Sequence, residues 1–167
     1  MIAPRSLQPR PATAADIEEL VRLRAFLLST GEGPYVARGP AEDAAWRRGY
    51  RVWLDRVLAQ PADRVHVAVI GEPADLGACA IAVVDDRAPT PLCPDGRTGW
   101  VQGVVVDPAL RRQGLGARVM EHALAWLRAR GASSVALQTT PDGARLYRNL
   151  GFLPSGEDLL TLDLREA

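Results

Sequence analysis

The chain reads Val104-Val-Val-Asp-Pro-Ala-Leu-Arg-Arg-Gln-Gly-Leu-Gly-Ala117 through the segment that decides its fold. The valines close an apolar run that predicts a strand over residues 100–106, and Asp107-Pro108 ends it. Apolar residues then recur at helical spacing, which predicts a helix over residues 115–130 that stops at Gly131. Gly103 lies inside the strand, where a glycine commonly marks a bulge or a close approach to the backbone. The segment therefore predicts a strand, a turn and a helix in immediate succession.

The turn between this strand and this helix is suited to binding an anion. The first amides of a helix have no intrahelical acceptor and lie at the positive end of its dipole. Gly114 and Gly116 let the backbone approach a phosphate, and Arg111 and Arg112 add positive charge. A Gly-x-Gly turn alone is equally compatible with a plain tight connection. Two other phosphate-binding motifs are excluded, because a P-loop needs a lysine, which the chain lacks, and the dinucleotide fingerprint needs a glycine where Val119 stands.

The remaining elements follow from apolar periodicity and turn residues. Helices are expected over residues 12–30, 40–59 and 142–150, and strands over residues 65–70, 78–84, 135–139 and 160–164. The first two strands suit an antiparallel hairpin with a loop of several residues, and residues 85–99 read as a long Pro/Gly loop. No repeat or internal boundary is visible, so residues 1–167 are expected to form a single domain. The order of elements favours a mixed α/β sheet with helices on both faces.

Composition and charge restrict the partners. Twenty arginines balance twenty acidic residues, so no long-range field favours nucleic acid or an anionic membrane. The longest apolar run, residues 78–84, is too short to cross a bilayer, and the first fifteen residues lack a secretory h-region. Cys79 and Cys93 show neither metal-ligand spacing nor a disulfide pattern, so we expect reduced thiols and no metal. A cytoplasmic location is the resulting expectation.

Two motifs at the right separation resemble the GNAT N-acetyltransferase superfamily. They are Arg111-x-x-Gly114-x-Gly116 after an apolar strand, and Leu146-Tyr147-Arg-Asn-Leu-Gly151-Phe152 further along. The stretch Pro11-Ala-Thr-x-x-Asp16-Ile also resembles the family's entry into its first helix, and the resemblance spans most of the chain. It implies transfer of an acetyl group from acetyl-coenzyme A to an amine. It also implies a central, mostly antiparallel mixed sheet flanked by helices, with splayed strands that form the acetyl-CoA cleft.

The resemblance implies roles for individual residues. The pantetheine arm would pair with the exposed edge of Val104, Val105 and Val106 like an added strand. The Val104 N–H would stabilise negative charge on the thioester oxygen. Tyr147 would protonate the departing thiolate, with a core or helix-capping tyrosine as the alternative. The pyrophosphate cradle would consist of the backbone of Arg111, Arg112, Gln113, Gly114, Leu115, Gly116 and Ala117.

The sequence offers no clear general base. The place where histone-acetylating relatives carry a glutamate is Trp100 here, and Gln102 on the same face cannot accept a proton. Activity is therefore expected to rise with pH until the acceptor amine is neutral. His66 has a suitable unperturbed pKa, although a lone strand histidine is more often structural. The family's usual asparagine before the tyrosine motif is absent; Thr139 or Thr140 could supply a hydroxyl there, or cap the next helix.

The acceptor is expected to be a small-molecule amine. By analogy with the superfamily, residues 26–35, the helix around residues 46–53 and the loop 85–99 would frame it. Acidic residues in or near these regions would suit a cationic amine, or would simply be surface charges: Glu32, Glu42, Asp85, Asp86 and Asp95. A peptide amine is the alternative acceptor, and a non-catalytic acyl-CoA sensor or structural domain is the alternative function. The oligomeric state stays open, with a homodimer among the options.

Overall fold

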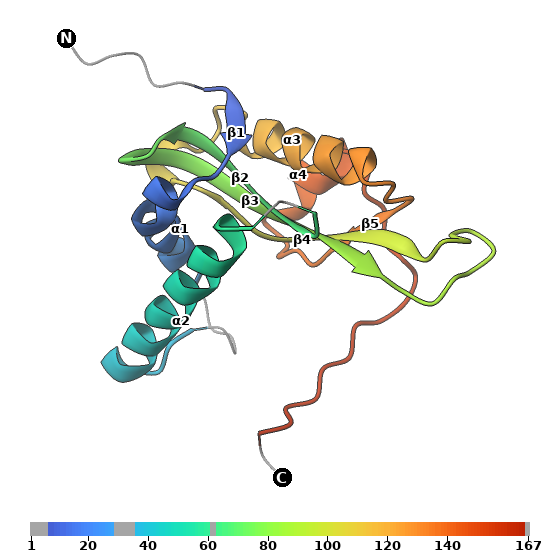
Figure 1. Cartoon of the computed structure of the whole chain (residues 1–167), viewed down its shortest axis with the longest axis horizontal. Helices are drawn as coiled ribbons and strands as arrows, with labels where there is room; N and C mark the ends of the chain where they lie inside the picture. Colours follow the sequence, from blue (N-terminus) through green and yellow to red (C-terminus); the bar gives the residue numbers. More distant parts are fainter. Residues whose placement is uncertain (1–6, 29–35, 61–62, 166–167) are drawn as a thin grey trace.

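The structure, a computed structural model, describes residues 7–28, 36–60 and 63–165 (Figure 1). Five strands form one sheet in the order β1-β2-β3-β4-β5. Every neighbouring pair is antiparallel except β4 and β5, which run parallel. The strands are β1 (Pro9–Pro11), β2 (Val65–Glu72), β3 (Asp75–Asp86), β4 (Arg97–Val106) and β5 (Val135–Leu137). The mixed, mostly antiparallel sheet expected from the sequence is confirmed.

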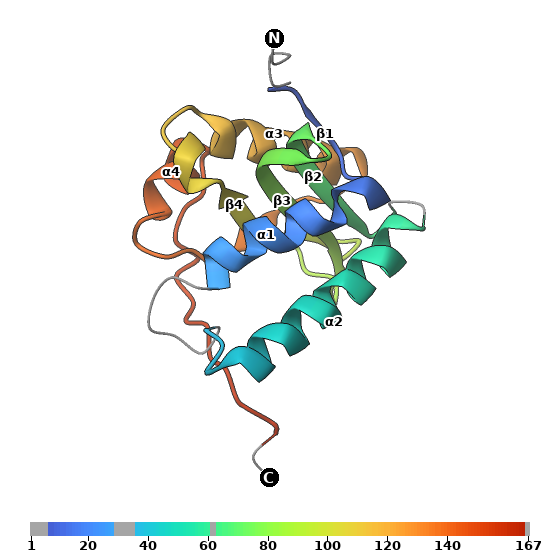
Figure 2. The same ribbon diagram turned by 90° about the vertical axis from the view of Figure 1, so that its left-hand side faces the viewer.

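Helices cover both faces of this sheet (Figures 1 and 2). Side chains alternate along each strand, so Ala68 and Ala80 pack on the face of α3 whereas Val69 and Cys79 pack on the face of α1. The apolar core is thus split into two layers, one on each side of the sheet. The helices are α1 (Ile17–Leu28), α2 (Pro40–Leu58), α3 (Leu115–Ala129) and α4 (Ala144–Asn149), with 3₁₀ turns at Ala14–Asp16 and Pro108–Leu110.

The two hairpins are tighter than the sequence predicted. Glu72 pairs with Asp75, so only residues 73–74 connect β2 to β3, and a register shift at Gly71 accommodates the turn. In the second hairpin the strands extend to the pair Asp86–Arg97, which shortens the predicted loop 85–99 to residues 87–96. Paired backbone groups therefore continue into segments whose proline and glycine content indicated loop.

The predicted strand over residues 160–164 is wrong. Leu160, Leu162 and Leu164 are 81–88% exposed, and residues 152–165 contain no regular secondary structure. The period-two pattern is typical of a strand, but a strand also needs a hydrogen-bonding neighbour. No described strand pairs with this segment, and β5 pairs only with β4.

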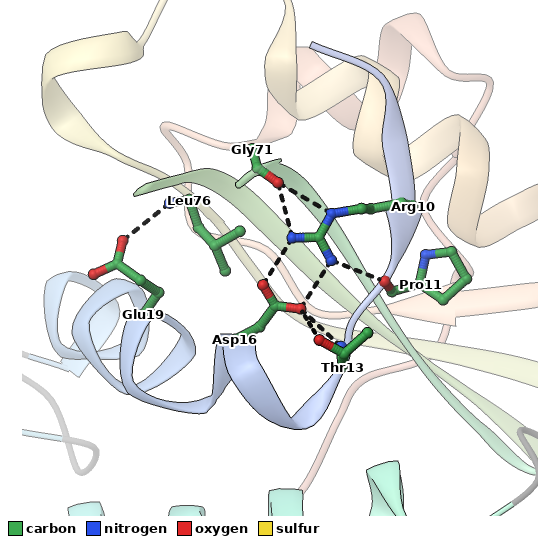
Figure 3. Close-up of polar contacts among 7 residues, drawn as sticks. All are labelled: Arg10, Pro11, Thr13, Asp16, Glu19, Gly71 and Leu76. Carbon is green, nitrogen blue, oxygen red and sulfur yellow. Dashed lines mark hydrogen bonds and ion pairs between the residues drawn. The ribbon is translucent and has the colours of Figure 1, made fainter. Parts of the chain in front are cut away.

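A buried ion pair ties the N-terminal strand to the start of α1 (Figure 3). Both terminal nitrogens of Arg10 lie 2.8 Å from the carboxylate of Asp16, and the guanidinium also donates to the Gly71 carbonyl. The Thr13 N–H donates to the same carboxylate at 2.7 Å, so Thr13 and Asp16 form a capping box at the start of this helical segment. Burial alone would raise the pKa of Asp16, but the hydrogen bonds from Arg10 and Thr13 outweigh it and hold the pKa below its usual value. Asp16 is thus a structural carboxylate.

Candidate active site

The strand β4 carries a bulge at Gly103. Cys79 pairs with Val105 while Ile81 pairs with Gln102, so β4 has one residue more than β3 over this stretch. Gly103 takes the extra position with a φ of +60°, and its carbonyl accepts a weak bond from the Cys79 thiol at 3.6 Å. The bulge suggested by the glycine is confirmed, and it bends β4 just before Val104.

Beyond this bulge one edge of β4 has no strand beside it. The parallel strand β5 pairs only with Gly99, Trp100 and Val101. The N–H of Asp107 donates to Gly77 on the β3 side at 2.8 Å. Because alternate residues of a strand point their N–H groups to opposite sides, those of Val104 and Val106 point to the uncovered edge. This edge can accept an extended ligand as an added strand.

The helix α3 begins next to this edge without a side chain covering its amides. Gly114 is the N-cap residue with a φ of 79°, and no side chain caps the helix. The first intrahelical bond runs from Arg118 N–H to the Gly114 carbonyl, so the three preceding amides, of residues 115–117, have no helical acceptor. Arg112 has a φ of 66°, the only positive value at a non-glycine position in the described residues. This strained turn leaves backbone donors without a helical acceptor at the start of α3, as an anion cradle requires.

The two glycines of the turn, Gly114 and Gly116, have different structural roles. A methyl group added at Gly114 would meet nothing within 4 Å, so the space above the α3 amides is open. A methyl group at Gly116 would lie 3.2 Å from Leu146 Cδ2 and 3.6 Å from Val106 Cγ2. Gly116 therefore lets α3, α4 and β4 pack closely, whereas Gly114 gives the turn its backbone conformation.

A polar network that the motif analysis missed holds the end of β4 in place. Asp107 accepts from the Ala109 N–H at 2.9 Å and from Arg22 at 2.7 Å. Arg22 in turn pairs with Glu19 at 2.9 Å, so α1 is tied to the start of the loop. An aspartate before proline is a common turn-capping signal, and that signal could have identified Asp107. Its partner on α1, Arg22, is not indicated by any comparable sequence signal.

Tyr147 lies on α4 next to the start of α3. Its ring packs edge-on against Phe152, with centroids 5.9 Å apart, and its neighbour Leu146 contacts Gly116. Burial raises the pKa of the Tyr147 phenol, which therefore stays protonated at neutral pH. No described residue forms a hydrogen bond with its hydroxyl. Tyr147 thus carries a hydroxyl without a described partner, on a helix that packs against the start of α3.

The threonines before α4 do not cap it. Thr139 Oγ1 donates to the Thr140 carbonyl at 2.9 Å, and the N-cap residue of α4 is Gly143, with no side-chain cap. The capping alternative for these threonines is therefore wrong.

The acidic residues proposed around the acceptor do not gather at the bulge. Asp86 pairs with Arg64 at 2.7 Å and Asp85 with Arg87 at 3.5 Å. Asp95 accepts from the Arg97 N–H at 3.0 Å, and Glu42, in the first turn of α2, accepts from the Arg38 N–H at 2.7 Å. Glu32 lies outside the described residues. Each of the four described acids thus already has a partner within the protein. Across the described ranges, no three histidine, cysteine or acidic side chains are grouped so as to hold a metal ion.

His66 lies in the apolar layer under α3. Its ring stacks on Trp126 at 5.1 Å and lies 5.2 Å from His122, and its Nε2 has no hydrogen-bond partner. Burial, with help from His122 and Arg130, lowers the pKa of His66 from 6.5 to about 4. Its strand, β2, is separated from β4 by β3. His66 is a core residue, and the described geometry does not bring it to the β4 edge.

A stability measurement should reveal this buried histidine. In the unfolded chain His66 binds a proton near pH 6.5, whereas in the folded protein it does so only near pH 4. The contribution of neutral His66 to the free energy of unfolding is therefore full above pH 6.5 and is lost as the pH falls. The shift corresponds to about 2 kcal/mol at pH 5. Denaturant titrations should show that the free energy of unfolding falls between pH 7 and pH 5 in the parent. In a His66→Phe variant we expect this fall to be smaller by about the same amount. Equal falls in the two proteins would contradict the assignment of His66 as a buried neutral core residue. Loss in this variant of a limb near pH 6 to 7 in the pH profile of kcat/KM would also contradict it.

Comparison with known proteins agrees with this geometry. The acetyltransferase (GNAT) family is matched over residues 34–152. Glucosamine 6-phosphate N-acetyltransferase 1 of Oryza sativa subsp. japonica is 36% identical over 106 residues, which are 62% of each chain. The probable glucosamine 6-phosphate N-acetyltransferase 2 of the same plant is 27% identical over 90% of this chain and 95% of its own.

Solved structures give the same fold. A GCN5-related N-acetyltransferase from Ralstonia eutropha JMP134 aligns with a TM-score of 0.74 and 26% identity, over 93% of this chain and 97% of its own. A predicted acetyltransferase with acetyl-CoA from Clostridium acetobutylicum aligns with a TM-score of 0.76 and 22% identity, over 96% and 97%. Because the family match covers well over half of the chain and includes the bulged strand, the α3 turn and Tyr147, this chain belongs to the acetyltransferase (GNAT) family.

Proposed function

We propose that the chain is an acetyl-CoA-dependent N-acetyltransferase that acts on a primary amine of a small molecule, as one domain over residues 1–167. The observation that carries the proposal is the open β4 edge, to which the Val104 and Val106 amides point, lying next to the uncapped α3 amides. A thioester ligand with a pyrophosphate needs both features at once. The glucosamine 6-phosphate acetyltransferases among the relatives support a small-molecule amine over a peptide.

The chain's residues would divide the work along the ligand. The turn from Arg111 through Gln113 and the amides from Gly114 to Ala117 would hold the pyrophosphate, and the backbone from Val104 to Val106 the pantetheine arm. Bound acetyl-CoA supplies an activated acetyl group as a thioester.

Two residues would assist the transfer itself. The acceptor nitrogen attacks the carbonyl carbon directly, and the Val104 N–H donates to the oxygen as negative charge grows there. The carbon–sulfur bond then breaks, and the protonated Tyr147 hydroxyl donates to the departing thiolate. No base is assigned, so the acceptor must arrive as the neutral amine. The extra proton that its nitrogen carries after attack passes, directly or through solvent, to the Tyr147 phenolate and restores the phenol.

A thiol-release assay tests the proposal. Purified protein is incubated with acetyl-CoA and a panel of primary amines that includes glucosamine 6-phosphate, and free thiol is measured against an amine-free control. Amine-dependent release is the expected result. Binding of acetyl-CoA without release for any amine would instead favour a non-catalytic sensor or structural domain.

The cellular setting is also a proposal. None of the described helices is long and apolar enough to cross a membrane. Both cysteines, Cys79 and Cys93, are free and buried, which suits a reducing compartment. We therefore propose that the protein works in the cytoplasm.

We further propose that two copies associate through the C-terminal segment. Five leucines between residues 153 and 164 are more than 60% exposed, and three of them alternate as in a strand. Such a segment gains a neighbour and covers its leucines when two copies exchange it symmetrically. Light scattering should give a dimer for the parent and a monomer for a Leu160→Ser, Leu162→Ser variant. A monomeric parent at micromolar concentration would refute this association.

A further inference from the structure

The arginine at position 24 lies directly over the β4 bulge. It projects from α1, and a methyl group added at Gly103 would lie only 3.3 Å from Arg24 Nη1. Gly103 immediately precedes Val104, whose N–H we place at the reacting carbonyl. A positive charge is therefore held beside the proposed point of acetyl transfer, on the α1 face of the sheet.

The guanidinium is oriented by aromatic stacking. Its central carbon lies 4.7 Å from the centre of the Tyr50 ring, and Tyr50 itself stacks on Trp53 at 5.9 Å with a 17° angle between the planes. Stacking occupies a face of the guanidinium, and the N–H groups that do not bond the Tyr50 hydroxyl remain in its plane for a ligand. Arg24 is thus preorganised for a planar, multidentate acceptor.

The charge of Arg24 is not compensated by its neighbours. Burial raises the pKa of the Tyr50 phenol and raises that of the Cys79 thiol to about 12, so both groups stay neutral. Among the residues that the structure describes, no carboxylate lies within ion-pair distance of Arg24. Arg22, two positions earlier on the same helix, is by contrast compensated by Glu19 and Asp107.

We infer that Arg24 binds an anionic group of the acceptor, so that the substrate carries both a primary amine and a phosphate or carboxylate. A half-buried guanidinium with no counter-ion among the described residues gains most from an anion that arrives with the ligand, through paired charge-assisted hydrogen bonds. This inference rests on the proposed function and adds a substrate class to it. Phosphate fits because relatives of the chain act on glucosamine 6-phosphate, an amine that bears one.

The test compares acceptors that differ only in the anionic group. Glucosamine 6-phosphate is paired with glucosamine, and γ-aminobutyrate with butylamine, so that the two pairs separate phosphate from carboxylate. The parent should prefer the anionic member of one pair by at least tenfold in kcat/KM. Arg24→Gln should lower kcat/KM for that member by at least tenfold, mainly through KM, and should change the neutral member by less than twofold.

Arg130→Gln is the matched control. Arg130 also stacks on an aromatic ring, 4.2 Å from the centre of the Trp126 ring, but it lies at the C-terminal end of α3, opposite the ligand-binding turn. This variant should leave kcat/KM unchanged for both members of each pair. Coenzyme A affinity should be the same in all three proteins, which shows that they are folded.

The outcomes separate the two claims. An equal loss for both members, no loss, or a parent that prefers the neutral amine would refute the role of Arg24 while leaving acetyl transfer intact. Absence of turnover with every amine would refute the proposed function, and the inference with it.

Discussion

In a folded Gly114→Val variant, coenzyme A affinity measured by calorimetry is expected to fall by about a hundredfold or more, roughly 2.7 kcal/mol. Gly114 has a φ of 79°, which a β-branched residue rarely adopts. Its added side chain would project into the open space above the α3 amides, where we place the pyrophosphate. Both effects act on the ligand-binding turn rather than on the core.

The matched control is Gly156→Val. Gly156 has a similar φ of 77° and equally open surroundings, but it lies in the C-terminal segment away from the turn. This control should bind coenzyme A like the parent. Unchanged affinity in a folded Gly114→Val protein would show that the pyrophosphate lies elsewhere.

In a Tyr147→Phe variant we expect turnover to fall about a hundredfold, the scale typical of losing a positioned acid, while coenzyme A affinity stays the same. The substitution keeps the ring and its edge-on contact with Phe152 and removes only the hydroxyl, which has no described partner. Burial keeps this hydroxyl protonated at the pH of the assay. Single-turnover rates should be used, so that chemistry rather than product release is measured. Equal rates for mutant and parent would remove Tyr147 from the mechanism.

The core of the candidate site could be predicted because it is local in sequence. The strand, Gly103 and the α3 entry all lie between residues 97 and 117, and each follows from turn residues and apolar periodicity. The positive φ values at Gly103 and Gly114 are those that glycine permits. Apolar periodicity did not predict that Gly116 packs against α4, because α4 is distant from Gly116 in the sequence.

Arg24 illustrates what the sequence could not supply. Nothing around it in the sequence distinguishes it from Arg22, the other arginine of the first helix. Its position over Gly103 depends on how α1 crosses the sheet, and its orientation depends on Tyr50 from α2. The sequence instead led us to expect acidic residues near the acceptor, whereas the described acids have other partners and the charge next to the bulge is positive.

The strand prediction over residues 160–164 was wrong for a different reason. Alternation of Leu160, Leu162 and Leu164 is typical of a segment that prefers the extended conformation, but a strand forms only where a free strand edge is available for pairing. A single chain offers no described partner there. Local pattern therefore cannot distinguish a strand from a segment that pairs only with another molecule.

The most direct test of acetyl transfer by direct attack is mass spectrometry of a quenched single turnover with isotopically labelled acetyl-CoA and an acceptor that supports thiol release. Both the small-molecule product and the intact protein are measured at each time point. The account predicts that the label appears on the acceptor nitrogen in step with thiol release and never on the protein, whose Cys79 thiol is buried and neutral. Label found first on the protein, or released only as acetate, would contradict direct transfer to the amine.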